Sequence, residues 1–139
     1  MTEVVQTIEI AAAPDGVWAV VGDPGRIGEW VPALAASSAE KDIRQCTTQE
    51  GGAIVERILE HSDEKRYYAY EITESPLPLR SYHSLIAVQG HDGHSHVTWE
   101  AHFQATSHEH EAELVRTFDT IYREGLATLR SRFEAVVTA

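Results

Sequence analysis

The contrast between two parts of the chain constrains the fold most strongly. From residue 33 to residue 105, apolar segments of strand length alternate with turn signals, and no helical period lasts longer than a turn or two. Residues 109–133 then carry apolar side chains at helical spacing over about seven turns. The sequence therefore predicts an antiparallel meander of about six strands followed by one long amphipathic helix.

The first thirty residues predict a further strand and two short helical pieces. Apolar and polar residues alternate from Val4 to Ala11, a pattern typical of a strand. Pro14 and Asp15 favour a helix start, and Gly22 begins the turn that ends this helix; a second short piece is expected over residues 26–30. A curved sheet of about seven strands needs a cover for its concave face, so the long helix must lie across it. We expect this α+β helix-grip arrangement to leave a cavity between helix and sheet.

The last predicted hairpin has the best-determined register. Asp92-Gly93 is a strong type I′ turn signal and places His91 opposite His94. Counting outward from this turn gives two faces. Tyr82, Ile86, Trp99 and Phe103 should point into the core, whereas His83, Glu100 and His102 should point to solvent.

Composition and charge narrow the class of protein. Because 42% of the 139 residues are hydrophobic and 24% are charged, we expect an ordinary globular protein with a single domain over residues 1–139. The formal net charge of −11 would repel nucleic acid and anionic membranes, so neither is an expected partner. The N-terminal segment has no features of a secretory signal, and no apolar run is long enough for a bilayer span, so we expect a cytoplasmic protein.

Several short motifs occur in a characteristic order. They are Ala-Pro-Asp-Gly-Val-Trp at 13–18, Gly-Glu-Trp-Val-Pro at 28–32, Val-Glu-Arg at 55–57, Tyr-Glu-Ile at 70–72, Leu-Pro-Leu at 77–79, Val-Thr-Trp at 97–99 and Tyr-Arg-Glu-Gly-Leu at 122–126. In these motifs and their spacing the chain resembles, over nearly its whole length, the polyketide cyclase/dehydrase-like branch of the START-like or SRPBCC superfamily. The resemblance implies a Bet v 1-like/START-like fold whose cavity binds a hydrophobic or aromatic small molecule. It does not separate enzymes from carriers.

A set of large side chains forms the candidate ligand pocket, because strand parity or helical phase aims them into the same space. Tyrosine and tryptophan combine a flat apolar ring with a hydrogen-bonding group, which suits a polyphenolic or polyketide-like ligand. The alternative is that these rings simply fill a core, whereas ligand binding needs a cavity of about 300 Å³. The candidate pocket residues are Trp30, Arg44, Glu56, Tyr70, Tyr82, Trp99, Phe103, Phe118 and Tyr122.

Glu56 is the acid whose position is most informative. It lies within an apolar strand segment, where an inward carboxylate would be poorly solvated and would need a partner. A three-residue loop at Gly51-Gly52 would place Arg44 opposite Glu56. The other strand parity, which would turn Arg57 inward and Glu56 outward, stays open.

The same residues suggest an acid/base mechanism. In a cyclase or dehydratase a buried carboxylate removes a proton next to a carbonyl, while a tyrosine hydroxyl or an arginine stabilises the enolate oxygen. Glu56, Tyr70 and Tyr82 are therefore the candidate catalytic residues. An ion pair with Arg44 would instead hold Glu56 ionised, which favours a structural or ligand-anchoring role.

The hypotheses for the histidines and for the single cysteine are weaker. His83, His96, His102 and Glu100 share one predicted face, and His83 is opposite His102, so a shared metal is an alternative to exposed histidines. Because this face should meet solvent, exposed histidines are the expectation, and we expect no metal or other cofactor. Cys46 has no motif around it and is interpreted as a small buried hydrophobe.

Two classes of function remain. A binding or carrier protein needs only an apolar cavity with polar anchors, whereas a cyclase or dehydratase also needs a titrating group beside its substrate. We take small-molecule binding as the primary hypothesis and cyclisation or dehydration of a polyketide-type substrate as the alternative.

Overall fold

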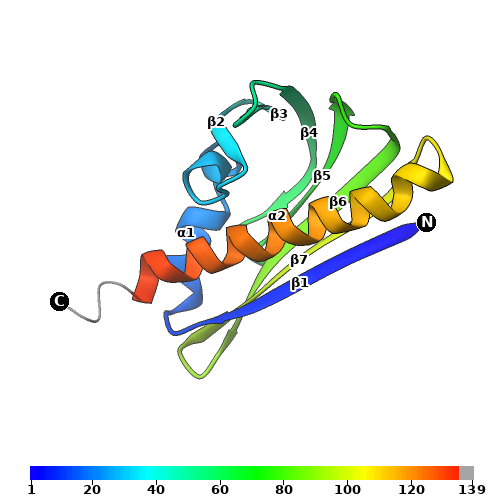
Figure 1. Cartoon of the computed structure of the whole chain (residues 1–139). Helices are drawn as coiled ribbons and strands as arrows, with labels where there is room; N and C mark the ends of the chain where they lie inside the picture. Colours follow the sequence, from blue (N-terminus) through cyan, green and yellow to red (C-terminus); the bar gives the residue numbers. More distant parts are fainter. Residues whose placement is uncertain (135–139) are drawn as a thin grey trace.

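A computed structural model describes residues 1–134 of the chain. Within this range the elements follow the predicted order, with one strand, two short helices, six further strands and a long helix (Figure 1). Their bounds are β1 Thr2–Ile10, α1 Pro14–Val21, the 3-10 helix η1 Pro24–Glu29, β2 Leu34–Glu40, β3 Ile43–Thr48, β4 Ala53–Ser62, β5 Tyr67–Glu74, β6 Leu79–His91, β7 His94–Ala105 and α2 His108–Glu134.

Over residues 1–134, the strands form one seven-stranded sheet in the order β1-β7-β6-β5-β4-β3-β2, and every neighbouring pair is antiparallel. β1 and β2 therefore lie at opposite edges, and α1 and η1 connect them. The long helix α2 crosses the curved sheet and lies alongside β1 (Figure 1). This architecture confirms the predicted helix grip.

The predicted hairpin register is confirmed. Tyr82 is paired with Phe103 and Ile86 with Trp99 across β6 and β7. Asp92 and Gly93 both have positive φ angles, of 51° and 78°, as a type I′ turn requires. The inward residues of this hairpin are buried, while the opposite face is at least partly exposed.

Helix α2 covers the sheet through one apolar stripe. Its buried residues recur at helical spacing, so a single face points to the concave side of the sheet. One of them is Gly125, where an added Cβ would lie 3.3 Å from atoms of Trp99 and Val31. The missing side chain lets the helix approach the core closely. The buried residues of α2 are Leu114, Phe118, Tyr122, Gly125, Leu126 and Leu129.

The predicted boundaries needed small corrections. The long helix extends one residue beyond 109–133 at each end. The second helical piece is a 3-10 helix that begins at Pro24 rather than at Arg26, because Asp23 accepts a hydrogen bond from the Gly25 backbone N–H and starts the turn earlier. Across residues 1–134, none of the helices is long and apolar enough to cross a membrane.

Candidate functional site

A small cavity lies between the concave face of the sheet and α2. We call it the inner cavity; its volume is about 80 Å³ and its wall is mostly apolar. Six of the candidate pocket residues line it, namely Glu56, Tyr70, Tyr82, Trp99, Phe118 and Tyr122. Strand parity brings the first four together from β4, β5, β6 and β7, and helical phase brings Phe118 and Tyr122 from α2.

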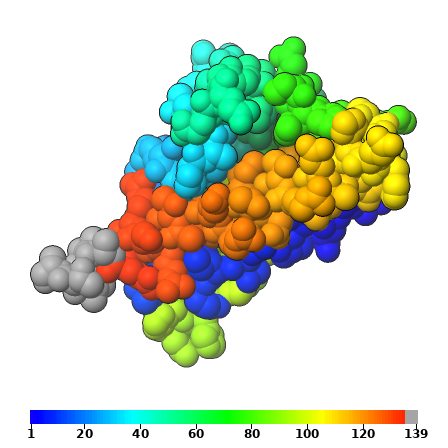
Figure 2. Space-filling view, viewed as in Figure 1, coloured from blue at the N-terminus to red at the C-terminus, as the bar shows by residue number. Residues whose placement is uncertain are grey.

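A wider depression, the outer cleft, continues from the inner cavity toward the surface. Its volume is about 490 Å³, and it lies between the β3–β4 turn, the segment that joins β5 to β6, and α2. Figure 2 shows this side of the molecule, where the teal, green and orange parts of the chain meet. The cleft and the inner cavity share the lining residues Ala33, Thr48, Ile54 and Ile121. The two spaces therefore adjoin.

The inner cavity is smaller than expected. We expect a cavity large enough for a ligand of about 300 Å³, whereas the inner cavity measures about 80 Å³. Stacking of the Trp99 and Tyr122 rings, whose centroids are 3.9 Å apart, fills much of the region under the helix. The Tyr82 and Phe118 rings pack beside them, with centroids 5.0 Å apart. At this site, the volume reaches that of a ligand when the outer cleft, of about 490 Å³, is included.

Part of the inner wall is polar. The Tyr82 hydroxyl hydrogen-bonds to that of Tyr122 and lies 3.4 Å from that of Tyr70. The Trp99 indole N–H donates to the Tyr70 hydroxyl over 3.2 Å and to Ser84 Oγ over 3.1 Å. Burial raises the pKa of Tyr70, and burial together with Tyr70 holds the pKa of Tyr82 well above its usual value. These groups are neutral hydrogen-bonding groups near neutral pH.

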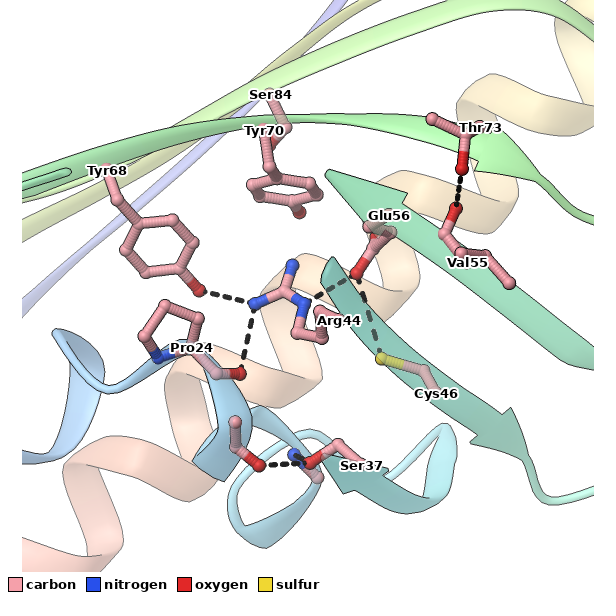
Figure 3. Close-up of polar contacts among 12 residues, drawn as sticks. Pro24, Ser37, Arg44, Cys46, Val55, Glu56, Tyr68, Tyr70, Thr73 and Ser84 are labelled. Carbon is pink, nitrogen blue, oxygen red and sulfur yellow. Dashed lines mark hydrogen bonds and ion pairs between the residues drawn. The ribbon is translucent and has the colours of Figure 1, made fainter. Parts of the chain in front are cut away.

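A buried ion pair lies at the sheet side of the cavity (Figure 3). The register places Arg44 opposite Glu56, as predicted, and Arg44 Nε donates to Glu56 Oε1 over 2.6 Å. Arg44 has no exposed surface and Glu56 is 7% exposed. Arg57 points to solvent and pairs with Glu71, so the parity that turns Glu56 inward is the one adopted. The ion pair with Arg44 thus offsets the free-energy cost of burying the Glu56 carboxylate.

Further contacts hold the Arg44 guanidinium. Its Nη1 donates to the Tyr68 hydroxyl over 2.8 Å and to the Pro24 carbonyl over 3.2 Å. Its central carbon lies 4.4 Å from the centroid of the Tyr70 ring, a cation–π contact visible in Figure 3. Burial disfavours the charged guanidinium, but Tyr68 and Glu56 hold the pKa of Arg44 well above its usual value. The guanidinium is therefore a fixed positive charge that links η1 to the sheet.

Three candidate pocket residues do not line the inner cavity. Trp30 is buried behind Trp99, with ring centroids 5.3 Å apart, and Phe103 packs behind Phe118 at the same centroid distance. Arg44 lies behind Glu56 and the Tyr70 ring. All three are buried, as expected of inward side chains, but neighbouring side chains separate them from the cavity.

Sequence reasoning missed other residues of this region. Tyr68 is fully buried and accepts a hydrogen bond from Arg44. Its position two residues before Tyr70 on the same strand would have revealed its inward direction. Cys46 lines the inner cavity, and its Sγ lies 3.7 Å from Glu56 Oε1. The shared passage residues Ala33, Thr48, Ile54 and Ile121 carry no motif that marks them.

The histidines of the convex face lie away from this cavity. His83 and His102 are paired in the register, yet His83 faces Glu71 at 3.8 Å and His102 faces Glu3 at 3.5 Å. Their side chains are 51% and 43% exposed, in agreement with the predicted direction. Glu3, Glu100 and His102 form a group whose oxygen and nitrogen atoms lie within 4.8 Å of one another. Glu3 is exposed and the other two residues are half-buried, and exposed acidic groups of this kind are common in proteins without a metal ion.

Solved structures share this fold over nearly the whole chain. The protein XoxI from Bacillus cereus is 28% identical, with a TM-score of 0.92 and 98% of both chains covered. The Zhui aromatase/cyclase from a Streptomyces species is 15% identical, with a TM-score of 0.87 and 98% and 95% of the two chains covered. A START superfamily protein from Mycobacterium smegmatis is 10% identical, with a TM-score of 0.81 and 96% and 98% covered. None of the curated proteins compared matches the chain.

The sequence itself matches one family model. The match spans residues 1–134, which includes every strand of the sheet, the long helix and all residues that line the inner cavity. The matched model is the one described as polyketide cyclase / dehydrase and lipid transport. This chain, with its seven-stranded helix-grip sheet and the cavity beneath α2, therefore belongs to that family.

Proposed function

We propose that this protein binds a small hydrophobic ligand, aromatic or polyketide-like, between α2 and the sheet. The observation that carries the proposal is the junction of the inner cavity with the outer cleft through four shared lining residues. The cleft supplies volume for the body of the ligand, and the inner cavity takes one end of it. Most of the wall is apolar, and the polar groups gather at the inner end, as is typical of sites that orient a ligand.

The charge of the protein supports a small neutral ligand. The formal net charge is −11, which disfavours polyanionic partners. Arg44 Nε donates to Glu56, and its Nη1 donates to Tyr68 and Pro24, while its Nη2 is buried and has no hydrogen-bond partner among the described residues. The guanidinium lies behind Glu56 and the Tyr70 ring and does not line the inner cavity. An apolar or aromatic molecule gives up few hydrogen bonds with water when it enters such a space. The burial of its apolar surface contributes favourable free energy of binding.

The shared passage provides the test. Ile121 lies on α2 and lines both the inner cavity and the outer cleft, whereas Thr120, its neighbour, is exposed. We expect indane to bind the parent protein, as measured by calorimetry, and Ile121→Phe to weaken this binding at least about tenfold by narrowing the passage. Thr120→Phe is the matched control and should bind like the parent. Absence of binding to the parent, or equal binding by both variants, would contradict the proposal.

An enzyme of the cyclase or dehydratase type is the second candidate function. It is favoured by Glu56, a carboxylate on the wall of the same cavity that carries the hydroxyls of Tyr70 and Tyr82. A carboxylate base and a hydroxyl donor on one wall suit proton removal next to a carbonyl. The contact that Arg44 makes uses Oε1 of Glu56 and not Oε2. If the protein is an enzyme, Glu56→Gln should retain ligand binding and lose turnover, whereas a carrier should show no turnover in either form.

A further inference from the structure

The hydroxyl groups on the inner wall have more protons than they have acceptors. Tyr70, Tyr82 and Tyr122 form a chain in which the middle hydroxyl, that of Tyr82, contacts both others. Each hydroxyl has one proton to donate, and each contact between two hydroxyls uses one proton. Three hydroxyls joined by two contacts therefore leave one O–H that donates to neither of the other two hydroxyls. This count is the same whichever direction the two hydrogen bonds take.

The neighbours of the chain do not absorb this surplus. The Trp99 indole N–H is a donor only, and it brings a further proton to the Tyr70 oxygen. Ser84 Oγ accepts from Trp99 and donates to the Glu100 carbonyl over 2.7 Å. Among the described residues, no hydrogen bond carries a proton from these three tyrosine hydroxyls to an acceptor outside the group. Since all three tyrosines line the inner cavity, the surplus O–H is available to its contents.

We infer that the ligand carries a neutral hydrogen-bond acceptor, such as a ketone or quinone carbonyl, at the end that enters the inner cavity, where it receives the surplus proton of the Tyr70–Tyr82–Tyr122 chain. This inference rests on the proposed function and deepens it. A buried donor without an acceptor destabilises the site. A ligand that supplies the acceptor removes this cost, and a pure hydrocarbon does not.

The electrostatics of the wall select a neutral acceptor over an anion. Glu56 lines the same cavity and forms the buried ion pair with Arg44. A second anion there would be repelled, and Arg44 does not line the cavity, so it is not placed to compensate a ligand charge. The Tyr70 and Tyr82 hydroxyls also keep their protons near neutral pH, because burial raises the pKa of both groups. The wall is thus a neutral donor.

A matched pair of probes tests the inference. Indane and 1-indanone have nearly the same shape and differ by a carbonyl in place of a methylene group. Calorimetry on the parent protein should show 1-indanone binding roughly 2- to 10-fold more tightly than indane. If neither probe binds, the proposed function fails; if both bind equally, the function stands and the inference is overturned.

Tyrosine variants test the proton count itself. The triple variant Tyr70→Phe/Tyr82→Phe/Tyr122→Phe has no surplus O–H and should bind both probes equally. Removing all three hydroxyls together also leaves none of them without its partner, which limits the cost to stability. Tyr82→Phe alone separates the two end hydroxyls, so each has a free O–H and the preference for 1-indanone should remain. A preference that survives in the triple variant, or that vanishes in Tyr82→Phe, would overturn the inference.

Discussion

Arg44 Nε lies 2.6 Å from Glu56 Oε1, and the Arg44 side chain has no exposed surface. The pair joins neighbouring strands at a point where β3 and β4 face the core. Two buried charges remain tolerable because Tyr68, Pro24 and the Tyr70 ring surround the guanidinium. Loss of one member leaves the other charge uncompensated.

Arg44→Met should lower the free energy of unfolding by about 3–5 kcal/mol, because it leaves the Glu56 carboxylate buried without its partner. The double variant Arg44→Met/Glu56→Leu should recover much of this loss, since both charges are removed. Urea denaturation of the parent and variants gives these values. The exposed pair of Arg57 and Glu71, with an N–O distance of 2.8 Å, is the matched control. Arg57→Met should cost at most about 1 kcal/mol, and an equal loss at the two sites would contradict the interpretation.

Alkaline pH should destabilise the protein through its buried tyrosines. Burial raises the pKa of Tyr68 to about 12 and also raises that of Tyr70 and Tyr82. An unfolded tyrosine has a pKa of about 10. Above about pH 10 the unfolded chain releases protons that the folded chain keeps, so stability is present below this pH and is lost as pH rises through the folded-state values.

The measurement is tyrosinate absorbance followed together with circular dichroism as pH increases. Ionisation of these tyrosines should coincide with loss of the folded signal. Tyr67 is the internal control, because its hydroxyl lies near the surface and its ionisation does not require the fold to open. Its hydrogen bond to Glu60, over 2.8 Å, and the charge of Glu60 raise the pKa of Tyr67. Full ionisation near pH 10 with intact dichroism would show that the buried hydroxyls titrate freely.

Gly125 should be sensitive to the size of its replacement. Alanine favours the helix by about 1 kcal/mol over glycine, but its Cβ would lie 3.3 Å from atoms of Trp99 and Val31. These two effects oppose each other, so Gly125→Ala should change stability by less than about 1 kcal/mol. Gly125→Leu should cost about 1–3 kcal/mol or more, because helix α2 must move away from the sheet. Urea denaturation measures both, and a harmless leucine would mean that the helix does not need this close approach.

Strand pairing and direction were predictable from the sequence because the turns determine the register. Asp92 and Gly93 adopt the positive φ angles that their residue types favour, and one correct turn fixes the parity of every residue in the hairpin. The pairing of Arg44 with Glu56 followed in the same way from a short loop. Parity, however, gives the direction of a side chain and not its depth. Trp30 and Phe103 point inward as expected, yet Trp99 and Phe118 stand between them and the cavity.

The volume of the cavity was not predictable for a related reason. It depends on how the rings of Tyr82, Trp99, Phe118 and Tyr122 pack against one another, and small changes in ring orientation open or close such a space. The outer cleft depends on the arrangement of loops between strands, which follows from contacts distant in sequence.

The rate at which a thiol reagent labels Cys46 tests the environment of the inner cavity. Cys46 lines the cavity and is 4% exposed. Burial, followed by the nearby Glu56 carboxylate, raises its pKa to about 12. Because the thiolate is the reactive form, labelling by a thiol reagent at about pH 8 should be slow in the folded protein and fast in urea.

Glu56→Gln removes a negative charge that raises the pKa of the Cys46 thiol, so the thiol of this variant should be labelled faster than that of the parent. Glu71→Gln, at the exposed pair, should label like the parent. The pH dependence of the rate distinguishes a lowered pKa from simple opening of the fold, since a lowered pKa moves the rate profile to lower pH and opening raises the rate at every pH. A Glu56→Gln profile that rises without moving would show that the carboxylate acts on access to the cavity and not on the charge of the thiol.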